Sequence, residues 1–246
     1  MYILALETTG KYGSAALCQD NMTDTVLVSS QNEMNHLKDI ITISDEAIKK
    51  AGIKKSDLTH IACSVGPGSF TGIRIGVTTA RTLSQMLGIP CISVSTLLAM
   101  AECSQHTANI NNCKLILATI NARRHQTYAG LWQLDENGKL TEVAAEKQYM
   151  IEEILSLAKE QGKRIYVTGD GIDAYQEIIE DTLDSDSYVL APEELRYQSA
   201  DSVAKLAAKQ IAKGEIVTYD KLLPNYMRLA EAEQKLREGN LSKKIK

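Results

Sequence analysis

The sequence of 246 residues has few residues of the kinds that build metal or disulfide sites. Its five cysteines are odd in number and form no CxxC pair, and its four histidines are scattered without an HExxH motif. Zinc sites require paired spacings of this kind, and a disulfide framework requires an even set of cysteines. We therefore expect reduced, mostly buried thiols and no metal site, as in a cytoplasmic protein.

Long apolar runs and an excess of positive charge are also missing. The sequence has no stretch of about 18 apolar residues, so no membrane span is expected. The first ten residues, MYILALETTG, contain no basic segment followed by a cleavage site, which argues against a secretory signal. The net charge of -4 gives no general attraction for nucleic acid.

The order of the predicted elements occurs twice along the chain. Residues 1–108 and 109–215 each read as three strands, a helix, a strand, a helix, a strand and a final helix, with the polar residues 104–112 as a linker. The repetition predicts an α/β protein of two duplicated lobes, each with a mixed sheet. Residues 216–246 form a tail that we expect to pack back on the N-terminal lobe, and its last residues read as a basic, solvated end.

The stretch SVGPGSFTGIRIGVTTARTL reads as the end of a strand, a glycine-rich turn and a long helix over residues 69–87. Gly66, Gly68 and Ser69 could place backbone N–H groups around an anion at the helix N-terminus. However, GPGSFTG lacks the GK[ST] of a P-loop and the full GxGxxG of a dinucleotide site, and Pro67 removes one donor. A role of this turn beside a ligand therefore stays open.

Small residues repeat along one face of the same helix. Gly68, Gly72 and Gly76 are spaced four residues apart, and Ala80 continues the row. An interior glycine costs a helix about 1 kcal/mol relative to alanine, so the row needs a compensating contact. We expect another backbone to approach it closely, either inside this chain or in a partner chain.

Two polar side chains are further candidates. Glu7, followed by Thr8 and Thr9, ends the first strand. A carboxylate there could orient a metal or a phosphate, but acceptance of hydrogen bonds from the turn is the favoured interpretation. His36 lies on the first predicted helix, residues 32–51, where a metal-binding helix would carry a second ligand three or four residues later. Position 40 is instead isoleucine.

Four motifs together resemble one protein family along the whole chain. They are ALETT near the N-terminus, SVGPGSFTGIRIGVTTARTL, INARR at residues 120–124 and PNYMR at residues 224–228. They are similar to the bacterial TsaB (YeaZ) family, which is needed to form threonylcarbamoyladenosine (t6A) at position 37 of tRNAs that read codons starting with A. The resemblance implies the actin-like ATPase fold of sugar kinases and heat-shock chaperones, in agreement with the duplication.

The resemblance also implies a non-catalytic role. TsaB-like proteins are paralogues of TsaD, the catalytic member, which carries an HxxxH metal motif on the helix equivalent to residues 32–51. Here His36 matches one histidine and Ile40 replaces the other, so this chain is expected not to hold that metal. No cofactor is expected for the isolated chain, and ATP or ADP only in a complex with its partner. Asn121 replaces the aspartate of the family's Asp-Ala-Arg, which removes a charge and keeps an acceptor.

The resemblance names the expected partners as a TsaD-like catalyst and a TsaE-like P-loop ATPase, with tRNA contacted only indirectly. Pairing with the catalyst, or homodimer formation in its absence, would use the first two helices. The expected interface comprises apolar and small residues of these helices, namely Met34, Leu37, Ile41, Gly72, Ile73, Gly76, Val77 and Ala80. Leucine in place of Gly72 or Gly76 is then expected to disrupt pairing while the monomer stays folded.

Two other functions fit parts of the sequence. An ATP-dependent small-molecule kinase of the same fold would need magnesium-binding carboxylates and phosphate loops, for which Glu7 and the GDG turn at residues 169–171 are the support. A peptidase, which an old glycoprotease label of the family suggests, would need a pair of metal ligands or a nucleophile with its base. The sequence contains neither a recognisable pair of metal ligands nor a nucleophile with its base, so the accessory role is preferred.

Overall fold

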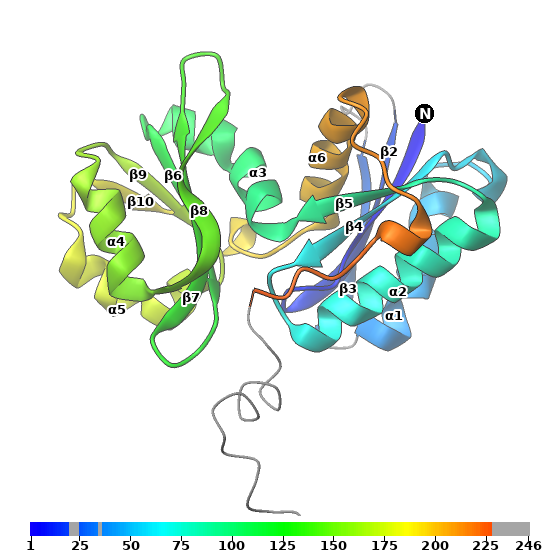
Figure 1. The fold of residues 1–246 in the computed structure, drawn as a ribbon, viewed down its shortest axis with the longest axis horizontal. Coiled ribbons are helices and arrows are strands. Elements are labelled where there is room, and N and C mark those ends of the chain that lie inside the picture. The colour runs from blue at the N-terminus through cyan, green and yellow to red at the C-terminus, as the bar shows by residue number, and fades with distance from the viewer. Residues whose placement is uncertain (20–24, 34–35, 228–246) are drawn as a thin grey trace, which may run out of the picture.

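The computed structural model, which describes residues 1–19, 25–33 and 36–227, has two lobes side by side (Figure 1). The first lobe contains a five-stranded sheet in the order β3-β2-β1-β4-β5. Its strands are β1 (Tyr2–Glu7), β2 (Tyr12–Gln19), β3 (Thr25–Glu33), β4 (His60–Gly66) and β5 (Cys91–Ser95). Strand β1 pairs antiparallel with β2 and parallel with β4, so the sheet is mixed.

The second lobe repeats this sheet. Its strands are β6 (Leu115–Asn121), β7 (Gln126–Leu134), β8 (Leu140–Met150), β9 (Ile165–Thr168) and β10 (Tyr188–Leu190). Their order, β8-β7-β6-β9-β10, corresponds strand for strand to that of the first sheet. The central strand β6 again pairs antiparallel with one neighbour and parallel with the other. The predicted α/β class, with two duplicated lobes and mixed sheets, is confirmed.

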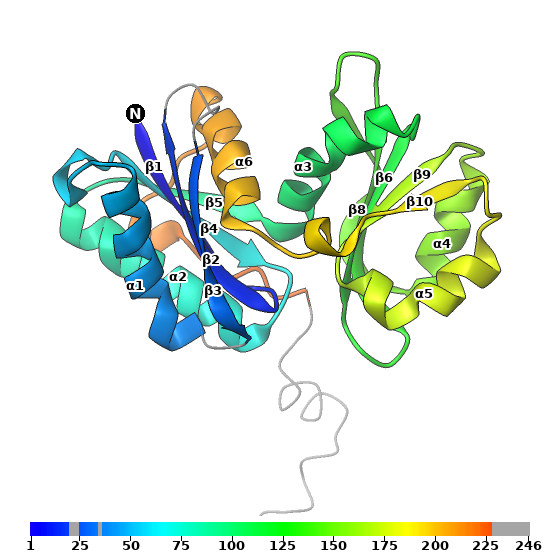
Figure 2. The same cartoon turned by 180° about the vertical axis from the view of Figure 1, so that it is seen from behind.

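Helices cover both faces of each sheet (Figures 1 and 2). They are α1 (His36–Lys50), α2 (Phe70–Leu87), α3 (Thr96–Ile110), α4 (Ile151–Glu160), α5 (Gly171–Thr182) and α6 (Ala200–Ala212). Helices α1 and α2 lie on the outer face of the first sheet, and α4 and α5 on the outer face of the second. Among the described residues, none of these helices has the length and apolar character needed to cross a bilayer.

The last helix of each half packs on the sheet of the other half. Leu97 and Met100 of α3 belong to the core of the second lobe, together with Ile116 of β6. Conversely, Val203 of α6 packs beside Ile3 of the first sheet. The predicted boundary at residue 108 therefore does not match the packing. Helix α3 was assigned to the N-terminal lobe and packs in the second, and α6 was assigned to the C-terminal lobe and packs in the first. Periodicity identified these helices without indicating which sheet each one covers.

Two local expectations need correction, and a third, on the tail, agrees with the structure. Strand β3 continues to Glu33, so the first helix begins at His36 and not at residue 32. Helix α3 runs to Ile110 through most of the polar stretch 104–112 that was expected to be a linker. The tail packs on the N-terminal lobe through residues 217–225, where Leu222 is fully buried in the first core.

The core of the second lobe contains the single tryptophan of the sequence. Trp132 of β7 is 4% exposed and packs among the aliphatic side chains of this lobe. Its ring lies over Gly130, where a Cβ would fall 2.3 Å from the ring atom Cη2. Only glycine leaves room for the indole at this position, so the two residues form one packing unit.

Helix α2 is held tightly against the end of β1. The side chain of Thr8 donates a hydrogen bond of 2.7 Å to the carbonyl oxygen of Gly72. A Cβ at Gly72 would lie 1.9 Å from the carbonyl oxygen of Thr8, and one at Gly76 would lie 2.4 Å from the Thr8 Oγ1. The close backbone approach predicted for the row of small residues is therefore confirmed, and the approaching backbone is that of Thr8 in the same chain.

The prediction that this row forms a docking face for another chain is therefore wrong. Gly72, Ile73, Gly76, Val77 and Ala80 are all buried within the first lobe, between α2 and its sheet. A side chain buried in the monomer has no surface left to offer another chain. The four-residue spacing identified one face of the helix correctly, but the sheet of the same lobe occupies that face. Met34 and the side chain of Leu37 lie outside the described residues.

We predict that Gly72→Ala lowers the free energy of unfolding by about 1–3 kcal/mol, because the new Cβ must displace the Thr8 carbonyl. Urea denaturation of the purified protein measures this change. Thr78→Ala, on the exposed face of the same helix, is the matched control and should change stability by less than about 0.5 kcal/mol. Equal stability of Gly72→Ala and the wild type would contradict the packing described here. Leucine at 72 or 76 is now expected to unfold the monomer.

Candidate functional site

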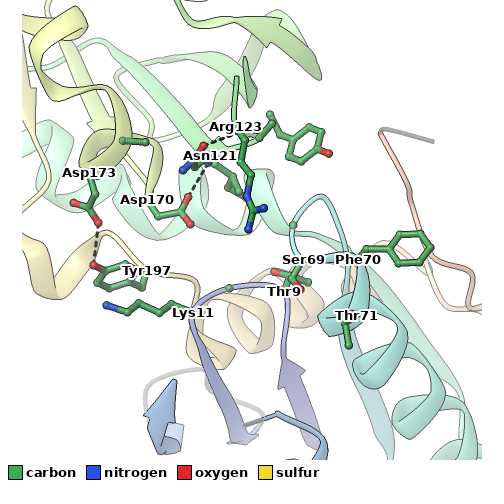
Figure 3. Close-up of a pocket in the computed structure, with 16 residues that line it drawn as sticks. Thr9, Lys11, Ser69, Phe70, Thr71, Asn121, Arg123, Asp170, Asp173 and Tyr197 are labelled. Carbon is green, nitrogen blue, oxygen red and sulfur yellow. Dashed lines mark hydrogen bonds between the residues drawn. The ribbon is translucent and has the colours of Figure 1, made fainter. Parts of the chain in front are cut away.

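A cleft of about 680 Å³ lies between the two lobes and is lined by residues of both (Figure 3). The first lobe contributes the β1–β2 turn, residues 9–11, and the start of α2, residues 68–71. The second lobe contributes the end of β6 and the start of the β6–β7 connection, residues 120–123, together with Asp170 and Asp173 at the start of α5. Tyr197, which precedes α6, also lines the cleft. A cavity of this size is typical of small-molecule sites.

Glu7 organises the β1–β2 turn from beneath. Its carboxylate accepts hydrogen bonds from the Thr9 N–H at 2.5 Å, from the Thr9 Oγ1 at 2.6 Å and from the hydroxyl of Ser64. Complete burial raises the pKa of Glu7, and these hydrogen bonds act in the opposite direction. The interpretation of Glu7 as an acceptor of hydrogen bonds from the turn is confirmed, and its side chain does not line the cleft.

The glycine-rich turn divides between two roles. Gly68 and Ser69 line the cleft with Thr9, and the Ser69 N–H donates to the Thr9 carbonyl at 2.8 Å. The Ser69 hydroxyl accepts from the Gly72 N–H, so it caps α2. Gly66, at φ +121°, instead faces the C-terminal segment. Of the six residues of the predicted phosphate or turn loop, Thr9, Gly68 and Ser69 therefore line the cleft, and Glu7, Thr8 and Gly66 do not.

On the opposite wall, Asn121 holds the β6–β7 connection in place. Its Oδ1 accepts hydrogen bonds from the Arg123 N–H at 2.8 Å and from the Tyr175 hydroxyl at 3.2 Å. Arg123 and the two residues after it have positive φ, between 55° and 64°, which is uncommon for residues other than glycine. The neutral amide therefore supplies the acceptor that orders this left-handed segment and places Arg123 at the cleft (Figure 3).

The two carboxylates at the start of α5 differ in their surroundings. Burial raises the pKa of Asp170 to about 6, and the nearby charge of Asp173 acts in the same direction. The hydrogen bond that Asp170 accepts from the Asn121 N–H, at 3.0 Å, opposes this shift. Asp173 pairs with Arg196 at 2.7 Å and accepts from the Tyr197 hydroxyl at 2.9 Å, so it links α5 to the segment before α6.

The kinase alternative rested on Glu7 and on the GDG turn, residues 169–171. Glu7, the expected magnesium carboxylate, is buried, and both of its oxygens accept hydrogen bonds from the protein. The glycines of the GDG turn serve packing, because Cβ atoms at Gly169 and Gly171 would lie 1.9 Å and 2.4 Å from oxygen atoms of Thr119. Both supports for the kinase alternative thus have structural roles in this chain.

A second candidate site is an apolar groove of about 170 Å³ between α1 and α2. Its apolar lining comes from both helices and the nearby loop: Ile41, Ile48, Leu58, Leu83, Met86 and Leu87. Ile41 is 55% exposed and Met86 is 78% exposed, which is unusual for large apolar side chains. An ion pair between Lys55 and Asp45, at 2.5 Å, lies at the edge of the groove.

The sequence indicated only part of this groove. Ile41 was expected at the interface, and it is exposed as that role requires. Leu83, Met86 and Leu87 were missed, although their spacing of three and four residues marks an apolar stripe at the C-terminal end of α2. The interface was instead predicted from the glycine row, which lies on the buried face of the same helix.

Comparisons with known proteins agree with one another. A family model described as TsaD, tRNA N6-adenosine threonylcarbamoyltransferase, matches residues 28–236. The chain is 31% identical to the tRNA threonylcarbamoyladenosine biosynthesis protein TsaB of Bacillus subtilis, over 96% of this chain and 97% of that protein. It is 30% identical to TsaB of Escherichia coli, over 96% and 98%. The solved structure of YeaZ from Pseudomonas aeruginosa has the same fold, with a TM-score of 0.74, 24% identity and coverage of 92% and 99%.

We predict that Asp170→Asn stabilises the protein at pH 8 by about 1–3 kcal/mol and leaves its stability at pH 4 nearly unchanged. The pKa of Asp170 is higher in the folded state, so ionisation between pH 4 and 6 destabilises the wild type, and asparagine removes that cost. Urea denaturation at both pH values measures the effect. Asp186→Asn, at an exposed position, is the control and should show no such pH dependence. A variant less stable than the wild type at pH 8 would contradict the assignment.

We also predict that isothermal titration of the isolated chain with ATP and magnesium detects no micromolar binding. Glu7 is held by the turn, and the glycines at 169 and 171 are packed against Thr119, so neither is free to organise phosphate or metal. Micromolar affinity would contradict this expectation and restore the kinase alternative.

Proposed function

The chain belongs to the TsaB family of tRNA threonylcarbamoyladenosine biosynthesis proteins, and from that premise we propose that it is the non-catalytic subunit that supports a TsaD-like catalyst. The observation that carries this proposal is the exposed apolar groove between α1 and α2, which lies away from the cleft on the outer face of the first lobe. A groove of this kind is suited to receive a helix of a partner.

The residue at position 40 of α1 supports the non-catalytic role. A TsaD-type catalyst is expected to hold its metal with two histidines on this helix, at the positions of His36 and residue 40. Here position 40 is Ile40, which is 2% exposed and part of the first core. Its side chain therefore stabilises the fold and supplies no donor atom.

Pairing would place a helix of the catalyst against Ile41 and Met86 and bury their apolar surface. Each large apolar side chain that becomes fully buried contributes about 1.5–3 kcal/mol. In the absence of the catalyst, a second copy of this chain would cover the same groove, and a TsaE-like ATPase would join the pair. Contact with tRNA would be indirect, in keeping with the net charge of -4.

The proposed mechanism is one of coupling. A subunit that binds only one conformation of its partner shifts the partner's population toward that conformation. Such a subunit needs a docking surface that is itself rigid. Thr8 fixes the N-terminal half of α2 to the first sheet, and the C-terminal half of the same helix carries Leu83 and Met86. One side of the groove therefore lies on helix α2, which the packing of the first lobe keeps rigid.

Reconstitution of the modification tests this function. We expect threonylcarbamoyladenosine to form on tRNA when the TsaD-like catalyst, the TsaE-like ATPase, ATP and an activated threonylcarbamoyl donor are supplied with this chain, and not when this chain is omitted. Mass spectrometry of the digested tRNA measures the product. Full activity without the chain would contradict the proposal.

The double variant Ile41→Lys, Met86→Lys is predicted to weaken pairing with the catalyst about tenfold or more, because two charges must then enter the apolar interface. Both side chains are exposed, so the monomer should remain folded. Isothermal titration measures the affinity, and circular dichroism checks the fold. Ile110→Lys is the matched control, since Ile110 is 66% exposed on α3, outside the groove. Unchanged affinity of a well-folded double variant would contradict the proposal that the catalyst docks on this groove.

A further inference from the structure

The C-terminal segment after α6 returns along the whole first lobe. We call residues 217–227 the C-terminal strap. Val217 forms an antiparallel bridge with Cys91 at the edge of β5, with two N–H···O hydrogen bonds of 2.8 Å. Leu222 is fully buried in the first core, and the Asn225 N–H donates to the Val65 carbonyl at 2.8 Å. Figure 1 shows the strap, in orange, running across this lobe to the space between the two lobes.

The end of the strap is fastened to the start of α2. The ring of Tyr226 stacks on Phe70, with centroids 4.7 Å apart and an interplanar angle of 29°. The guanidinium of Arg74 lies 4.0 Å from the centroid of Phe70, and its Nε donates to the Tyr226 hydroxyl at 2.9 Å. Phe70 is also among the residues that line the cleft, so this cluster stands at the edge of the cleft.

Glycine at position 66 makes this path possible. A Cβ at Gly66 would lie 2.5 Å from the carbonyl oxygen of Asn225, and its φ of +121° favours glycine in any case. The approach of the strap thus accounts for the first glycine of GPGS, a residue that does not line the cleft. The sequence suggested a ligand at this turn, and the neighbour of Gly66 is the chain's own C-terminal segment.

Beyond Tyr226 the strap crosses to the other lobe. Met227 packs against the hydrophobic core of the second lobe, whereas the rest of the strap contacts the first lobe. Other contacts also join the lobes. Ser95 bonds Glu146 at 2.5 Å, Lys209 of α6 pairs with Glu102 of α3, and Tyr197 donates to Asp173 and packs edge-on against Tyr12. These contacts involve α3, the residue before it, or the segment before α6, where the chain itself passes between the lobes. The strap adds a link from a third segment of the chain.

We propose that residues 225–227 act as a clasp that joins the two lobes at the edge of the cleft and limits how far the cleft opens. Lobes connected by a few chain crossings are expected to rotate relative to one another, and a contact across their gap restricts this hinge motion. Tyr226 anchors the clasp on the first lobe, and Met227 is the part that reaches the second. This inference does not depend on the proposed function, because it concerns the isolated chain.

Hydrogen exchange of the full chain, followed by mass spectrometry, tests the clasp. Met227→Ala removes most of the contact with the second lobe and leaves the anchor on Phe70 in place. We expect exchange to become about tenfold faster in peptides from both walls of the cleft, residues 9–11 and 121–124, and to stay unchanged in α1 and α4. Met227→Leu, which keeps the apolar volume, should restore the exchange of the wild type.

Leu223→Ala is the matched control, because Leu223 lies on the same strap and is 58% exposed. It should leave exchange at the cleft unchanged. The proposal is overturned if Met227→Ala leaves exchange unchanged, if faster exchange is confined to the strap itself, or if the control produces the same effect. Equal acceleration in every peptide of the protein would indicate general destabilisation and would also overturn it.

Discussion

The contact between Thr8 and Gly72 fixes the relation among the cleft, the apolar groove and the C-terminal strap. It joins the end of β1 to the first turns of α2 through one hydrogen bond and one backbone approach that only glycine permits. The β1–β2 turn and the start of α2 form one wall of the cleft. The far end of α2 forms one side of the apolar groove, and its first residue anchors the strap. Movement of α2 would therefore disturb all three regions.

Much of the fold could be predicted because each half has a clear pattern of elements. The duplication, the mixed sheets and the helices α1 and α2 follow from apolar periodicity and from glycine positions, which depend on local sequence. The assignment of α3 and α6 to the opposite lobes could not be predicted, since an apolar face indicates burial and does not identify the covering sheet. The same limit applies to Gly72 and Gly76, whose spacing predicted a close neighbour but not that Thr8 is that neighbour.

The candidate site was predicted less well, for a related reason. Glu7, Thr8 and Thr9 are consecutive in sequence, yet a sharp turn sends the first into the core, the second against α2 and the third to the cleft. Such a division depends on turn geometry and on partners distant in sequence, such as Ser64. Met86 was missed although it continues an apolar stripe on α2, because the stripe does not indicate that Ile41 of α1 lies across from it. The sequence indicated that Asn121 keeps an acceptor. That this acceptor binds the Arg123 N–H could be learned only from the geometry of the loop.

The packing of Trp132 over Gly130 has a consequence for how the unfolding of this protein is observed. The indole is buried in the second lobe, and it is the single tryptophan of the sequence. Intrinsic tryptophan fluorescence therefore reports on that lobe alone, whereas circular dichroism in the far ultraviolet reports on the helices of both lobes. If the two signals coincide during denaturation, the lobes unfold as one cooperative unit. If they separate, their difference gives the stability of each lobe without any label.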